Sequence, residues 1–115
     1  MRPIEKQIND RLKEIADLAY KINTLYDDYV TTANVFISYA VDEHGFTIEF
    51  KNLGGVGTRY IEFDDLERAN NNFIKLKKHL EELFDLKKML MEMELNWHKM
   101  LENMQIRRKK NEKEI

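Results

Sequence analysis

The sequence VFISYAVDEHGFTIEFK, residues 35–51, has the period-two pattern of a β-hairpin. Alternate side chains from Val35 to Val41 are large and apolar, and a similar alternation runs from Phe46 to Phe50. The four residues 42–45 between the two runs predict a turn, in which we expect Gly45 to supply a positive φ. The stretch therefore predicts two antiparallel strands that present one apolar face.

A third strand is predicted at residues 60–63, after a glycine-rich connection over residues 52–58. Three glycines lie within residues 54–57 and raise the entropy that must be lost to order this segment, so we expect it to be mobile. Loops that bind phosphate lead into a helix, whereas this one leads into a predicted strand. The glycines thus indicate a flexible hairpin connector within a three-stranded meander.

Long helical patterns lie on both sides of the predicted sheet. Apolar residues recur at steps of three and four over residues 4–32, with Pro3 suited to the first turn. A second pattern runs over residues 64–110 without glycine or proline, and Asp64 with Glu67 predicts a capping box at its start. Lys87 and Glu94 interrupt its apolar seam.

These elements predict an α+β fold of order α-β-β-β-α in a single domain, residues 1–115. We expect helix 4–32 and helix 64–110 to form an antiparallel, coiled-coil-like hairpin that flanks the sheet of residues 35–63. In the order of its elements, this layout resembles prefoldin-type chaperone subunits, whose helical hairpin projects from strands that build the oligomer. The similarity is one of layout, and no sequence motif carries it.

The unequal helix lengths predict self-association. In an antiparallel hairpin, Ile4 would lie near Glu92, and the apolar residues beyond that point would lack a partner within the chain. Soluble monomers rarely expose so large an apolar surface, so we expect a homo-oligomer; a frayed terminal segment is the alternative. The predicted oligomer interface consists of Leu95, Trp97, Met100, Leu101 and Met104.

The charges are distributed unevenly along the chain, which has a net charge of −2. Residues 27–67 hold nine acidic and two basic residues, a net charge of −7, whereas the basic tail, residues 107–115, carries +3. An acidic head repels polyanions, so nucleic acid is an unlikely partner. Apolar runs are too short to span a membrane, and no export signal is evident, so we expect a soluble, cytoplasmic protein without membrane contact.

Few residues in the chain suit catalysis. There is no cysteine, and Ser38 is the single serine, which leaves little material for a nucleophilic triad. Glu94, His98 and Glu102 share one helix face, but without ligands from a second helix they indicate a surface charge ladder. We therefore expect no enzyme activity, no metal and no cofactor.

The sequence favours a non-enzymatic, oligomeric interaction or assembly protein that binds another macromolecule, expected to be a protein, as an adaptor, a chaperone-like factor or an inhibitor. One alternative is a module that binds a small ligand or nucleotide between subunits. A less favoured alternative is nucleic-acid binding through the basic tail. The ligand contacts conceivable for the small-ligand alternative are Arg59, Tyr60, Lys75, Lys77 and Lys78.

Overall fold

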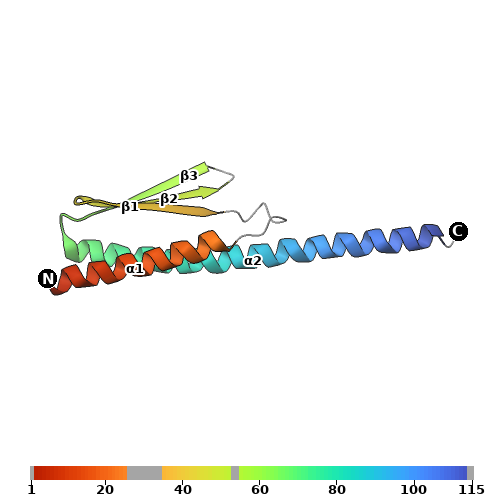
Figure 1. The fold of residues 1–115 in the computed structure, drawn as a ribbon, viewed down its shortest axis with the longest axis horizontal. Coiled ribbons are helices and arrows are strands. Elements are labelled where there is room, and N and C mark those ends of the chain that lie inside the picture. The colour runs from red at the N-terminus through yellow and green to blue at the C-terminus, as the bar shows by residue number, and fades with distance from the viewer. Residues whose placement is uncertain (1, 26–34, 53–54, 114–115) are drawn as a thin grey trace.

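The computed structural model describes residues 2–25, 35–52 and 55–113, and the side chains of these residues up to 110. In chain order, the elements are α1 (Pro3–Thr24), β1 (Phe36–Val41), β2 (Gly45–Asn52), β3 (Gly55–Glu62) and α2 (Leu66–Lys113). The strands form one antiparallel sheet in the order β1-β2-β3. This sheet lies on one side of the two helices (Figure 1). The predicted α+β class and element order are confirmed.

The two helices run parallel, so the predicted antiparallel hairpin is wrong (Figure 1). Contacts between the helices join residues that come later in α1 to residues that come later in α2. Glu14 contacts Lys77, and further along both helices the Ile22 carbonyl accepts a hydrogen bond from Lys87. Three strands explain this direction, because the chain reverses between consecutive elements and an odd number of strands returns it to the direction of α1. Ile4 consequently lies near Leu66 rather than near Glu92.

Several element bounds differ from the prediction. α1 ends at Thr24, and Leu25 donates its backbone N–H to the Lys21 carbonyl as the C-cap. Residues 26–32, which were predicted to continue the helix, lie outside the described residues. At the start of α2 the capping side chain is Asp65 rather than Asp64, because Asp65 Oδ1 accepts the backbone N–H of Arg68 at 3.2 Å.

The segment predicted to be a loop belongs largely to the sheet. β3 begins at Gly55, and residues 55–58 pair with β2, so that Asn52 faces Gly55 and Phe50 faces Gly57. Among the described glycines only Gly55 has a positive φ, of 138°. The prediction of a connector is therefore wrong for residues 52 and 55–58, and residues 53–54 lie outside the described residues.

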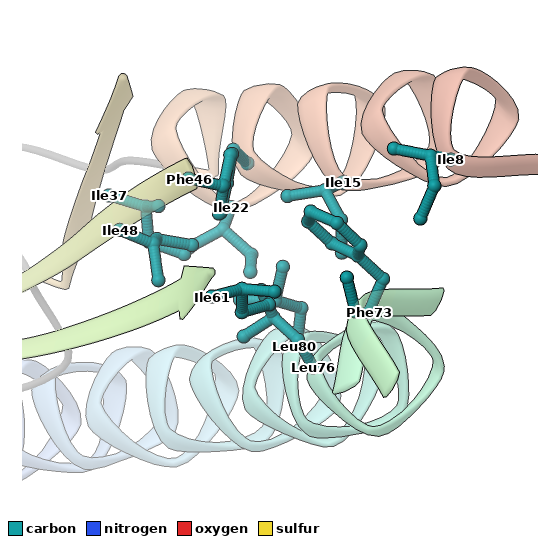
Figure 2. Packing of buried hydrophobic residues seen from close by; sticks show 12 residues of the cluster. Ile8, Ile15, Ile22, Ile37, Phe46, Ile48, Ile61, Phe73, Leu76 and Leu80 are labelled. Carbon is teal, nitrogen blue, oxygen red and sulfur yellow. The ribbon is translucent and has the colours of Figure 1, made fainter. Parts of the chain in front are cut away.

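The hydrophobic core lies between the sheet and the groove of the helix pair (Figure 2). β1 contacts α1 and β3 contacts α2, so the central strand β2 sits above the seam between the helices. The ring of Phe73 packs edge-on against Phe46, with centroids 5.3 Å apart. The fully buried large apolar side chains are Ile15, Ile22, Phe46, Ile48, Phe73, Leu76 and Leu80.

Gly45 is required by close packing rather than by a positive φ. In the β1–β2 turn, Asp42 Oδ1 accepts the backbone N–H groups of His44 and Gly45 at 2.8 and 2.9 Å, which lowers the pKa of Asp42. On the outer face of the sheet the Tyr60 side chain crosses over Gly45. A Cβ at position 45 would lie 2.5 Å from the Tyr60 hydroxyl oxygen and 2.6 Å from the Ile61 carbonyl oxygen.

Gly45→Ala is expected to lower the free energy of unfolding by about 1–3 kcal/mol, because a backbone carbonyl cannot move aside as a side chain can. Urea unfolding monitored by circular dichroism measures this change. Gly57→Ala is the control: it lies in β3, and a Cβ there meets nothing within 4 Å. Equal stability of the two variants would contradict the close approach at Gly45.

Candidate functional site

The second half of α2 extends beyond the body formed by α1 and the sheet (Figure 1). Near the end of α1, Leu25 and Leu95 pack against Met91, and residues 96–113 continue α2 for about 27 Å at 1.5 Å per residue. The molecule measures 78 × 24 × 16 Å, and its radius of gyration is 20.7 Å. A compact chain of this length would have a radius of gyration near ~13 Å. The long projection is the dominant feature of the shape.

One face of this projection carries a continuous row of exposed apolar side chains. The steps between them alternate four, three, four, three and four residues, which is the spacing of the a and d positions of a coiled-coil heptad. Trp97 is 57% exposed, and Met104 is 61% exposed. We call this row the α2 stripe; it consists of Leu86, Leu90, Met93, Trp97, Met100 and Met104.

The α2 stripe is distinct from the face of α2 that packs against the rest of the chain. At 100° per residue, Leu90 and Trp97 lie about 100° around the helix from the buried Leu80 and Met91. The end of α1 therefore leaves the α2 stripe accessible among the described residues. A second helix could lie along the stripe without displacing α1.

The structure places the predicted oligomer interface on this projection. Trp97, Met100, Leu101 and Met104 are exposed, whereas Leu95 is half-buried beside Met91. These side chains are exposed because α1 runs parallel to α2 and ends at Thr24, beside the middle of α2. The predicted antiparallel hairpin implied a different reason for their exposure.

Lys87, which interrupts the predicted seam, is a buried structural cation. Its side chain is 1% exposed, and its Nζ donates hydrogen bonds to the Ile22 and Val35 carbonyls at 2.7 and 2.9 Å. The Phe36 ring centroid lies 5.2 Å from the same nitrogen. Burial lowers the pKa of Lys87. Lys87 thus connects the last turns of α1 to Val35, the residue that precedes β1.

Asn23 makes a second junction at this end of α1. Its amide nitrogen donates to the Ile37 carbonyl, and its Oδ1 accepts the Ile37 backbone N–H, both at 2.7 Å. The side chain thereby pairs with β1 as a neighbouring strand would. Sequence reasoning missed both junctions, since a lone asparagine and a lone lysine carry no recognisable motif.

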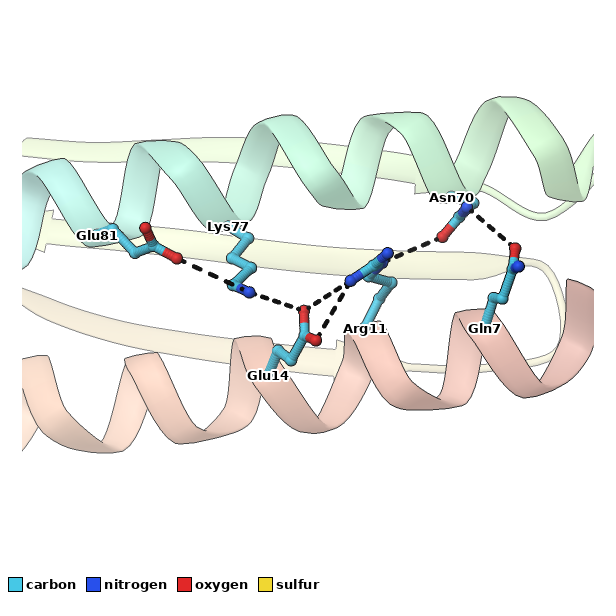
Figure 3. Close-up of polar contacts among 6 residues, drawn as sticks. All are labelled: Gln7, Arg11, Glu14, Asn70, Lys77 and Glu81. Atoms are coloured by element: carbon cyan, nitrogen blue, oxygen red, sulfur yellow. Dashed lines mark hydrogen bonds and ion pairs between the residues drawn. The ribbon is translucent and has the colours of Figure 1, made fainter.

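Lys77, one of the conceivable ligand contacts, lies between the helices instead (Figure 3). Its Nζ is 3.4 Å from Glu14 Oε2, and Arg11 donates to both oxygens of the same carboxylate at 3.2 and 3.1 Å. Burial raises the pKa of Glu14, but hydrogen bonds from Arg11 and Lys77 outweigh it, and the pKa is lowered overall. This network fixes how α1 and α2 sit side by side.

Three of the other candidates do meet. Arg59, Tyr60 and Lys75 line an open recess of about 300 Å³ between β3 and α2, together with Asn72 and Leu76. Two cations at one recess could attract an anion. The recess is open to water and the side chains of Arg59 and Lys75 are exposed, so such an attraction would be weak and sensitive to salt. Lys78 is exposed on α2 and does not line this recess.

The charge ladder on α2 is loosely connected. His98 Nε2 and Glu94 Oε1 are 4.0 Å apart. Within residues 2–25, 35–52 and 55–113, no group of three histidine or acidic side chains is arranged to hold a metal ion. None of the helices that the structure describes is long and apolar enough to cross a membrane.

No protein-family model, curated protein or solved structure matches this chain. The functional argument therefore rests on the geometry of α2 and the sheet.

Proposed function

We propose that this protein is a non-enzymatic interaction or assembly protein that associates with itself through the α2 stripe. The observation that carries the proposal is the uninterrupted heptad spacing of exposed apolar side chains from Leu86 to Met104. Scattered surface apolar residues are ordinary, but a row of six along one helix face is typical of a surface that another helix covers. Covering this row would remove apolar area from water and stabilise the assembly.

Such an assembly leaves the sheet available for a second macromolecule. The outer face of the sheet, which points away from the helices, exposes Val56 and Tyr60. We propose that this head, with its acidic surroundings, contacts the partner protein, so that the molecule acts as an adaptor, a chaperone-like factor or an inhibitor. The acidic head also disfavours nucleic acid as that partner.

Trp97→Ala is expected to raise the dissociation constant for self-association at least tenfold, because a large central aromatic side chain contributes strongly to an interface. Light scattering over a dilution series measures the constant. Ile106→Ala is the matched control: Ile106 is also an exposed apolar residue on the projection, but it lies off the α2 stripe. A wild-type chain that stays monomeric at tens of micromolar would refute self-association.

A further inference from the structure

We infer that the α2 stripe is covered by the α2 stripe of a second copy running in the opposite direction. This inference rests on the proposed self-association and adds its orientation and register. Three observations carry it: the charges along α2, the position of the apolar side chains within the stripe and the place where α1 ends.

The charge along the projecting part of α2 changes sign. Residues 81–94 contain five acidic and two basic residues, a net charge of −3, whereas residues 99–110 contain one acidic and five basic residues, a net charge of +4. A parallel pair in register would place like charges side by side. An antiparallel pair places the basic segment of each copy along the acidic segment of the other.

The apolar side chains set the register of this pair. The α2 stripe is centred between Met93 and Trp97, so the greatest overlap places Met93 against Trp97 of the partner subunit. Leu90 then lies against Met100 of the partner subunit and Leu86 against Met104 of the partner subunit, and the contacts repeat by two-fold symmetry. Arg108 comes level with Glu82 of the partner subunit, within the acidic segment.

One flank of the seam supports this arrangement. In this register Asn96 comes opposite Asn96 of the partner subunit, so two uncharged amides that can form hydrogen bonds lie beside the centre of the seam. The end of α1 packs against a face of α2 that lies about 100° around the helix axis from the α2 stripe, so the partner helix has room beside α1. A strict seven-residue repeat also matches the left-handed winding of two helices around each other.

The arrangement predicts a long molecule with its two sheets at opposite ends. Each chain is 78 Å long, and an overlap of about 55 Å along α2 gives a dimer of roughly 100 Å. A parallel pair would keep both sheets at the same end and stay close to the length of one chain. The two orientations are therefore separable by size alone.

The first test combines light scattering with small-angle X-ray scattering on the wild-type chain. A dimer with a maximum dimension of roughly 100 Å supports the antiparallel pair. A dimer close to 80 Å long overturns the antiparallel arrangement and leaves the proposed self-association intact. A monomer overturns both.

The second test uses charge. The double variant Arg107→Glu/Arg108→Glu should bind itself at least tenfold more weakly than wild type, since its tail would then face the acidic segment of the partner. The variant Glu82→Lys/Asp85→Lys should be weakened likewise, and mixing the two should restore dimers because each tail then meets the opposite charge. Circular dichroism confirms that each variant stays helical.

Salt gives the matching control. Association of the wild type should weaken as NaCl rises from ~0.05 to ~0.5 M, because the attraction between the segments is screened. Association that strengthens with salt, or a tail variant that dimerises as tightly as wild type, overturns the antiparallel arrangement.

Discussion

Phe73→Ala is expected to lower the free energy of unfolding by about 3–5 kcal/mol, the range for losing a large buried ring. Phe73 is 0% exposed, and its ring contacts Phe46 from β2 and Phe63 from the β3–α2 connection. It therefore fills the space at which the sheet meets α2, and alanine would leave a cavity that neighbouring side chains can fill only in part. Thermal or urea unfolding monitored by circular dichroism measures the loss.

The neighbouring residue provides the control. Ile74 is 43% exposed on the same helix, so Ile74→Ala should cost far less than Phe73→Ala. If Phe73→Ala does not fold, Phe73→Leu keeps most of the volume and should retain a cooperative transition at a lower midpoint. Equal losses for Phe73→Ala and Ile74→Ala would mean that the sheet does not pack on α2 as described.

The sequence predicts the order of helices and strands correctly, but its periodic patterns do not predict the direction of one helix relative to the other. The period of two in residues 35–51 and the steps of three and four on both sides identify the strands and helices, because burial of one face imposes these periods on each element. Direction depends instead on how many times the chain reverses. Counting three strands predicts parallel helices, whereas the expectation of an antiparallel hairpin leaves this count out.

The glycines show why local composition misleads. The sequence predicts that Gly55 and Gly57 belong to a flexible connector, yet both lie in β3, where Gly57 pairs with Phe50. The turn pattern predicts a positive φ at Gly45, yet the role of this glycine depends on Tyr60 and Ile61, which lie on another strand. A contact between residues fifteen or more positions apart leaves no local signal in one sequence.

The apolar surface of α2 could be predicted in part. The projecting residues Trp97, Met100 and Met104 were identified from the unequal helix lengths, and their exposure follows from where α1 ends. The full α2 stripe was visible as a heptad repeat from Leu86 onward, but it overlaps in sequence with the seam that packs inward. Only the contacts of Lys87 and Met91 separate the two faces.

Lys87→Met is expected to lower the free energy of unfolding by about 2–4 kcal/mol, because methionine keeps the length of the side chain but leaves two carbonyl groups without their donor. The carbonyls of Ile22 and Val35 lie 2.7 and 2.9 Å from the lysine nitrogen. Removing a buried charge recovers part of this cost. Urea unfolding at neutral pH measures the net loss, and Lys88→Met at the adjacent exposed position controls for removing a lysine.

The pH dependence of that loss tests the environment of Lys87 directly. Burial holds its pKa in the folded state below the ordinary value of 10.5, so between these two pKa values the unfolded chain binds more protons than the folded chain. The free energy of unfolding that Lys87 contributes therefore rises as the pH increases toward 10.5. The hydrogen bonds persist after deprotonation, because a neutral amine still has two N–H donors for the two carbonyls. The difference in stability between wild type and Lys87→Met should be larger at pH 10 than at pH 7. A difference that shrinks with rising pH would mean that the folded state favours the charged form, so that the two carbonyls and the Phe36 ring outweigh the effect of burial on the pKa of Lys87.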